Sequence, residues 1–366
     1  MTRRSTRPPE RHPFRGTSAG LLAVLAPAVL AAACGPAADK EPPSRSEQSA
    51  PVTQAQTASP AGSTRDAVGG ARDIDWKAVD TAMGRPGALR PGDVHRYSFP
   101  RSDMRVTVGR GARAVRVKPS LALGSWVAFK ATGDGAMAMG DLVLSEDEVA
   151  PVMSKLQEGG VEQTAVHHHV LHESPRVVYM HVHAMGDPVK IAQTVRGALE
   201  RTSTPAPTPA AVPSGGDRGD AAGAGRPGAG SEALGIDTAA ISRALGRAGK
   251  VNGGVYQVSV PRAETIRDGG MEVPPSMGLA TALNFQPTGG GKAAITGDFV
   301  MIASEVNIVI RALREHGIEL VSLHNHALGE EPRLFFGHFW ANADAAKLAR
   351  GLRAALDRTN SRRPGA

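Results

Sequence analysis

The chain has 366 residues, enough for two ordinary domains, and its 43 glycines and 27 prolines gather in a few stretches. Its net charge of +7 is largely an N-terminal feature, and no basic stripe with interleaved aromatic residues follows, so the composition excludes a nucleic-acid-binding protein as the leading interpretation. The single cysteine excludes disulfide bonds within the chain and a cysteine-ligated structural zinc site.

Residues 1–33 are predicted to be a signal peptide. A basic segment precedes an apolar run from Leu21 to Ala33, which is too short to remain as a membrane-spanning helix. Small residues end this run directly before Cys34, and this arrangement resembles a bacterial lipoprotein signal. We therefore expect export to the cell envelope and a lipid anchor on Cys34 that ties the protein to a membrane; the alternative is an ordinary secretory signal. Residues 34–72, rich in Pro, Ala, Ser and Gln, are predicted to form a disordered stalk.

The rest of the chain is duplicated. Residues 140–202 fall onto residues 297–359 without a gap when the sequence is shifted by 157 positions, and the identities include Glu148 with Glu305. Fainter matches continue upstream. We predict a first repeat over residues 73–202, a flexible linker over residues 203–235, and a second repeat over residues 236–360.

Both repeats predict the same order of elements. Each opens with a short amphipathic helix that ends at a glycine, over residues 74–84 and 236–246. In the first repeat, strands are expected over residues 94–100, 105–109, 123–131 and 138–144, followed by a helix over 145–160 with a capping box. Two further strands flank residues 172–176, and a last helix begins at Asp187 and runs to about residue 202. The order β-α-β-β-α predicts an α+β fold of two tandem pseudo-symmetric repeats, each an antiparallel sheet with helices on one face, which pair within the chain.

The stretch HNHALGEEPRLFFGHFW at residues 324–340, together with GDFVMIASEVN and the closing LARGLRAALDRT, resembles the LppY/LpqO family of bacterial, often lipid-anchored proteins built around a DUF1259 domain. The resemblance covers about residues 74–202 and 236–360 and is sharper in the second repeat. It implies an exported protein with a duplicated domain. It implies no particular activity and no catalytic residues.

Histidines occupy matching places in the two repeats. Alternate residues of a strand share a face, so a hairpin in which paired residue numbers sum to about 350 would bring four histidines of residues 167–183 together. Neutral imidazoles arranged in this way suit a divalent transition metal, zinc or similar. The predicted metal ligands are His167, His169, His181 and His183 in the first repeat and His324, His326 and His338 in the second. The alternatives are a structural hydrogen-bonded cluster and a metal-free ligand site.

Charged residues flank these histidines. Glu173 and Glu330 are the candidates for catalytic residues, because each could complete the site or act as a general base on a bound water. Arg176 and Arg333 are candidates for binding an anionic ligand, or for a salt bridge to those glutamates.

Asp141 and Asp298 each follow a glycine and are interpreted as turn or capping residues, with metal ligation as the alternative. The common signatures of serine hydrolases, zinc peptidases and nucleotide-binding enzymes are missing. The predicted function is that of an exported, lipid-anchored envelope protein that binds a divalent transition metal, with no reaction assigned. The alternative is a metal-free binding module for an envelope ligand, with a polar cleft lined by histidine and arginine.

Overall fold

The computed structural model describes residues 74–111, 114–206 and 234–363. The predicted signal peptide and stalk, the lipidation site at Cys34 and most of the linker lie outside the described residues. All described residues belong to one compact unit. Among them, no helix combines the length and the apolar character that crossing a bilayer requires.

The first repeat is built on a six-stranded antiparallel sheet with the strand order β1-β2-β5-β6-β9-β7. These strands are β1 (Ala88–Arg90), β2 (Val94–Pro100), β5 (Gly124–Ala131), β6 (Ala136–Leu144), β9 (Val178–Gly186) and β7 (Glu162–His167). Its helices are α1 (Trp76–Met83), the 3-10 turn η2 (Glu146–Glu148), α2 (Val149–Glu158) and α3 (Pro188–Leu199). A separate small sheet holds β3 (Thr107–Val108), β4 (Val115–Arg116) and β8 (Glu173–Ser174).

The second repeat has the same architecture, with the sheet order β10-β11-β14-β15-β17-β16. These strands are β10 (Lys250–Asn252), β11 (Val255–Pro261), β14 (Ala280–Gly289), β15 (Lys292–Met301), β17 (Phe335–Asp344) and β16 (Glu319–His324). The other elements are α5 (Thr238–Leu245), η3 (Pro275–Met277), α6 (Ala303–Glu315), α7 (Ala345–Leu356), and the pair β12 (Arg267–Asp268) and β13 (Met271–Glu272). The predicted α+β fold with two β-α-β-β-α repeats is confirmed.

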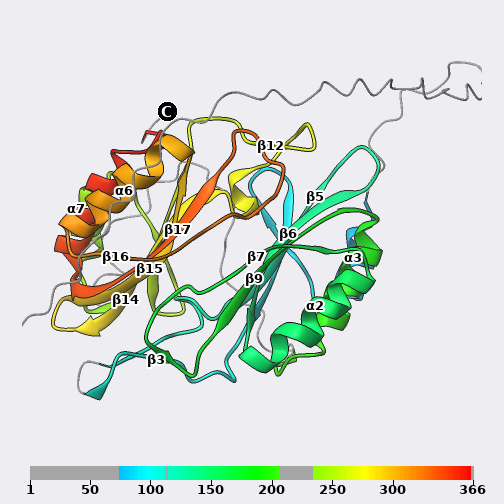
Figure 1. Ribbon diagram of the computed structural model, residues 1–366, viewed down its shortest axis with the longest axis horizontal. Helices are drawn as coiled ribbons and strands as arrows, with labels where there is room; N and C mark the ends of the chain where they lie inside the picture. Colours follow the sequence, from blue (N-terminus) through cyan, green and yellow to red (C-terminus); the bar gives the residue numbers. More distant parts are fainter. Residues whose placement is uncertain (1–73, 112–113, 207–233, 364–366) are drawn as a thin grey trace, which may run out of the picture. The chain divides into compact units, whose positions relative to one another are not determined.

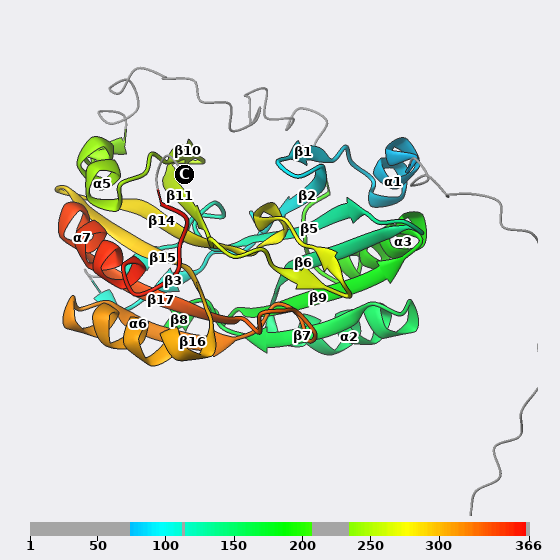
Figure 2. The ribbon, with the colours of Figure 1, turned by 90° about the horizontal axis from the view of Figure 1, so that it is seen from above.

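In each repeat the helices cover one face of the sheet, as Figures 1 and 2 show for α2 and α3 beside β6 and β9. Alternation along β6 directs Ala138 and Leu142 to this face, where they join a core cluster with Leu156 of α2 and Val195 of α3. Burying each large aliphatic side chain contributes roughly 1.5–3 kcal/mol, so this face fixes the helices to the sheet. The alternate residues Met139, Asp141 and Val143 point to the opposite face.

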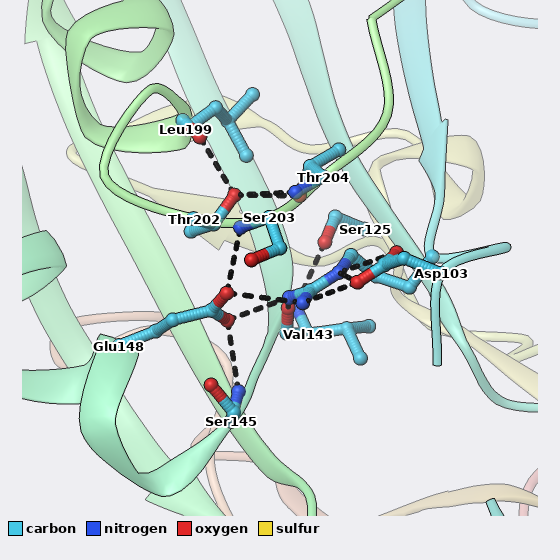
Figure 3. A network of polar contacts seen from close by, with 10 residues as sticks. Asp103, Ser125, Val143, Ser145, Glu148, Leu199, Thr202, Ser203 and Thr204 are labelled. Atoms are coloured by element: carbon cyan, nitrogen blue, oxygen red, sulfur yellow. Dashed lines mark hydrogen bonds and ion pairs between the residues drawn. The ribbon is translucent and has the colours of Figure 1, made fainter. Parts of the chain in front are cut away.

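Each repeat also buries one arginine that ties a helix start to the end of the repeat. Arg101 donates to both carboxylate oxygens of Glu148, with N–O distances of 2.7 and 3.0 Å, and to the carbonyl of Val143. Glu148 in turn accepts from the backbone N–H groups of Ser145 and Ser203, which joins the start of η2 to the chain that leaves α3 (Figure 3). The second repeat repeats these contacts with Arg262, Glu305, Val300, Ile302 and Asn360.

The sheet faces that the helices leave uncovered contribute to one shared core. Ala128 and Met139 of the first repeat share a buried cluster with Val300 and Phe336 of the second. Each edge strand, β7 and β16, bonds to the segment that follows the other. Thr164 Oγ1 donates to the carbonyl of His326, and Ser322 Oγ donates to the carbonyl of His168, both at 2.8 Å. The two histidine segments therefore meet where the repeats contact each other.

Candidate metal centre

The third histidine of each repeat lies on an inner strand. His181 of β9 and His338 of β17 project from the face away from the helices. Their Nδ1 atoms lie 3.1 and 2.8 Å from the carbonyl oxygens of Gly140 and Gly297. Because a carbonyl can only accept, Nδ1 carries the proton and Nε2 keeps its lone pair. A ring held in this way is oriented and prepared as a metal ligand.

The two histidines of each H-x-H pair come from a strand end and from the loop beyond it. His167 and His324 are the last residues of β7 and β16, and His169 and His326 follow two positions later. The ring of His169 stacks on Tyr179 at a centroid distance of 3.4 Å. The equivalent ring of His326 stacks on Phe336 at 3.5 Å.

The predicted register of this hairpin is wrong. His181 pairs with Ala165, and His167 pairs with Tyr179. Beyond the bulge between Gln163 and Ala165, the numbers of paired residues therefore sum to 346 and not to about 350. The bulge shifts the strand, and His169 lies beyond the paired residues. The H-x-H pair is therefore not directly opposed to the histidines of its own β9.

Histidines instead come together across the repeats. We call His167, His169, His181, His324, His326 and His338 the histidine cluster. The nearest imidazole to each of these rings belongs to the other repeat, with centroid distances of 3.8 Å in all three pairs. These pairs are His167 with His324, His169 with His338, and His181 with His326. Nε2 of His167 also lies 3.2 Å from Nε2 of His338.

Asp141 and Asp298 complete the cluster, and their interpretation as turn or capping residues is wrong. Asp141 lies inside β6 and Asp298 inside β15, and the strand residues on both sides of each aspartate are buried. Asp141 Oδ2 lies 3.3 Å from His169 Nε2, and Asp298 Oδ2 lies 3.0 Å from His326 Nε2. The signal that could have identified them was a carboxylate repeated within an apolar strand of both repeats.

The contact between His326 and Asp298 brings two hydrogen-bond acceptors face to face. His326 Nδ1 lies 3.0 Å from the carbonyl of Gly278, so its proton resides there and the lone pair of Nε2 faces the carboxylate. Two acceptors at 3.0 Å need a proton or a metal ion between them. Burial lowers the pKa of His326 to about 3, so at neutral pH the ring itself does not supply that proton.

Burial dominates the protonation of the whole cluster. It lowers the pKa of His338 to about 4, and burial followed by the neighbouring imidazoles lowers the pKa of His167 and His324 far below the usual value. Burial also raises the pKa of Asp298 to about 7. At neutral pH the histidine cluster is therefore a set of neutral nitrogen donors, the state in which imidazole binds metal.

Several oxygen and nitrogen atoms of the histidine cluster and its two aspartates are buried, and they have no hydrogen-bond partner in the part of the chain that the structure describes. They are Asp141 Oδ1, Asp298 Oδ1, His167 Nδ1, His169 Nε2, His181 Nε2, and both ring nitrogens of His324. Buried polar atoms normally have a partner, so a concentration of such atoms is the pattern expected of a binding site for an ion or a small polar ligand. Three groups have ligand atoms within 4.8 Å of one another. They are His167 with His169 and His338, His167 with His181 and His324, and Asp298 with His324 and His338.

His183 lies apart from these groups. Its Nε2 is 3.1 Å from Asp268 Oδ2 and its Nδ1 is 3.4 Å from Glu162 Oε2. A carboxylate therefore lies beside each ring nitrogen of His183. The second repeat has Trp340 at the equivalent position, which agrees with a role outside the shared cluster.

Glu173 and Glu330, the candidates for catalytic residues, hold the loops that follow the histidines. Glu173 Oε1 accepts from the backbone N–H of Val177 at 3.0 Å, and Glu330 Oε1 accepts from that of Leu334 at 2.9 Å. Neither glutamate belongs to the three groups of ligand atoms. Burial raises the pKa of Glu173 to about 7, and Oε2 of this residue is another buried atom without a described partner.

The two arginines have different surroundings. Arg333 Nη1 lies 3.2 Å from Glu330 Oε2, which is the salt bridge that the sequence offered as an alternative. Arg176 contacts Nε2 of His168 at 2.9 Å and lies 3.5 Å from Glu146, with 61% of its side chain exposed. Both arginines thus contact residues at the surface of the molecule, and the structure does not bring them into the histidine cluster.

Comparisons with known proteins identify the domain and no activity. A family model described as Domain of Unknown Function (DUF1259) matches residues 77–201 and 239–358, one match in each repeat. No curated protein matches the chain. Among solved structures the chain is similar to a trimeric bacterial microcompartment shell protein, PduB, with 11% sequence identity and a TM-score of 0.19 over 75% of this chain and 90% of that one. A TM-score this low carries no argument about fold or function.

Proposed function

The chain belongs to the DUF1259 family, whose domain it carries twice, and we propose that it binds a divalent transition metal in the histidine cluster. The observation that carries this proposal is the concentration of buried, unpartnered polar atoms on Asp141, Asp298 and four of the six cluster histidines. A purely structural cluster would satisfy these atoms with one another. A metal ion takes up the lone pairs of its histidine ligands, and its charge offsets the two buried carboxylates.

The spacing of the donors supports the same proposal. Ligands placed 2.0–2.1 Å from a tetrahedral zinc ion are separated from one another by roughly 3.3 Å. One pair of ligand atoms has nearly that separation, because Nε2 of His167 lies 3.2 Å from Nε2 of His338. Imidazole and carboxylate donors without thiolate suit zinc and its first-row neighbours.

Burial favours a closed site. The six cluster histidines and the two aspartates beside them are all buried or nearly so. The exposed fraction is 3% for His181 and 9% for His167. Structural metal sites are closed, whereas catalytic sites keep a position open for substrate or water. We therefore propose an ion that stabilises the contact between the repeats, with no reaction assigned to it.

The location of the protein is also a proposal. The basic segment, the apolar run from Leu21 to Ala33 and the adjoining Cys34 support export to the cell envelope, with a lipid anchor on that cysteine. Mass spectrometry of protein from a bacterial host tests it: a diacylglyceryl-modified N-terminal Cys34 is expected. An unmodified chain, or cleavage at another position, would contradict the anchor.

Metal binding is tested by equilibrium dialysis of the purified protein against Zn²⁺, followed by elemental analysis. The double variant His324→Ala/His326→Ala is expected to lose the bound metal. His168→Asn is the matched control, because the second repeat has Asn325 at that position, and it is expected to keep the metal. Equal metal content in the wild-type protein and the double variant, or no metal in either, would overturn the proposal and favour a metal-free binding module.

A further inference from the structure

Duplication of a metal-binding motif normally suggests one ion in each copy. The structure opposes this arrangement, because each ring of the histidine cluster has its nearest imidazole in the other repeat. Within the first repeat, His167 and His181 are 4.9 Å apart between centroids, and His167 and His169 are 5.0 Å apart. The rings are thus packed as one set across the contact and not as two separate sets.

The three groups of ligand atoms lead to the same result. Any two of them share one histidine: His167, His324 or His338. A neutral imidazole offers one lone pair and ligates one ion, so no two of these groups can hold ions at the same time. The three shared residues, drawn from both repeats, mark a common centre.

The internal symmetry supplies a fourth ligand. His167 and His324 occupy equivalent positions, and the residue equivalent to His338 is His181. His181 and His338 are matched in structure too, because each Nδ1 is held by the carbonyl of a glycine in the neighbouring strand. His167, His181 and His324 already form one of the three groups. His338, whose Nε2 lies 3.2 Å from that of His167, brings the imidazoles to four, the number that a tetrahedral ion requires.

We infer that the chain holds one metal ion, and not one in each repeat, on the pseudo-twofold axis between His167, His181, His324 and His338. This inference rests on the proposed function. Asp141 and Asp298 lie outside this ligand set, where two carboxylates balance the charge of one divalent ion beside His169 and His326. Binding the ion and closing the contact between the repeats are then one event.

The single-ion inference is tested by the number of ions bound per chain. Elemental analysis measures this number, and so does calorimetric titration of metal-free protein with Zn²⁺. One ion per chain is expected. Two ions per chain would overturn the single-ion inference while leaving the proposed function intact, and no ion would overturn both. This result needs no variant, so it stands even if substitutions in the cluster impair folding.

Single variants add a second readout. His167→Ala in the first repeat and His324→Ala in the second are each expected to weaken binding of the whole ion by about 100-fold or more, since both repeats supply the same site. Two independent sites would instead leave each variant with half the metal at unchanged affinity. His183→Trp, which copies Trp340 of the second repeat, is the control and should bind one ion; loss of the ion in this variant would overturn the ligand set.

Discussion

His167 and His324 occupy equivalent positions of the two repeats, and their imidazole rings stack on each other with centroids 3.8 Å apart and planes 15° apart. A residue that contacts its own counterpart lies at the pseudo-twofold axis between the two copies. The duplicated segments therefore form one site together, and neither repeat contains that site by itself.

Removing one carboxylate beside the cluster should weaken metal binding without removing a ligand of the four-histidine set. Asp298→Asn keeps the shape of the side chain and abolishes its charge, and we expect the affinity for Zn²⁺ to fall about 10- to 100-fold. Competition with a chelating dye measures this change. Asp357→Asn is the control, because that carboxylate is 60% exposed and pairs with Arg353 far along α7. Equal affinities of the two variants would contradict the role of Asp298.

Gly140 should be needed both for packing and for orienting His181. A Cβ atom at this position would lie 2.7 Å from the carbonyl oxygen of Trp126 and 2.9 Å from a methyl group of Val127. We expect Gly140→Ala to destabilise the fold by about 1–3 kcal/mol and to weaken metal binding, because β6 must move and the Gly140 carbonyl moves with it. Urea unfolding measures the first effect and metal titration the second.

Gly133→Ala is the matched control for that substitution. No atom among the described residues lies within 4 Å of the added Cβ, so the free energy of unfolding should change by less than about 0.5 kcal/mol. If both glycine variants were equally stable and bound metal equally well, the proposed dependence of His181 on this strand contact would be wrong.

The buried ion pair of Arg101 and Glu148 should contribute more to stability than an exposed ion pair does. Glu148→Gln leaves Asp103 as the remaining carboxylate partner of the buried guanidinium, and we expect a loss of about 1.5–3 kcal/mol in urea unfolding. Glu158→Gln, which breaks the exposed pair with Lys155, should cost less than about 1 kcal/mol. Similar losses in both variants would contradict this difference.

Much of this fold follows from the printed sequence. The two repeats, the helix start at Asp187 and the β-α-β-β-α order were predicted correctly, because repeated identities and capping residues are local signals. The histidine register was not, because the bulge before Ala165 leaves no clear mark in the residues themselves. Whether His169 faces His181 or His338 depends on contacts between the repeats, which no pattern within one repeat can reveal.

Two site residues were within reach of sequence reasoning. Asp141 and Asp298 each interrupt an otherwise apolar strand at the same position of the repeat, and a carboxylate that folding must bury calls for a partner. The replacement of His183 by tryptophan in the second repeat likewise marked that histidine as the least secure of the predicted ligands. The structure agrees, since its partners are Asp268 and Glu162.

Stability should depend on pH through Glu173. Burial raises the pKa of this carboxyl group from 4.5 to about 7, so the folded protein holds the proton more tightly than the unfolded chain does. The free energy of unfolding should therefore fall as pH rises through that window, by up to about 3 kcal/mol at about 1.4 kcal/mol per pKa unit.

The variant Glu173→Gln tests this pH dependence, because its side-chain carbonyl can still accept from Val177 while the titration is lost. Metal-free wild-type and variant proteins should be unfolded in urea at about pH 5 and about pH 8, and their difference compared. The histidine cluster is common to both proteins, so its own titration cancels. A difference that stays constant with pH would show that Glu173 does not titrate in this window.

The most direct test of the central claim is a crystal structure of the Zn²⁺-loaded protein, with anomalous diffraction recorded on both sides of the zinc absorption edge. One anomalous peak is expected, enclosed by Nε2 of His181 and His338 and by ring nitrogens of His167 and His324, at about 2.0–2.1 Å from each. A histidine cluster without a peak would contradict metal binding, and two peaks would contradict the single shared ion.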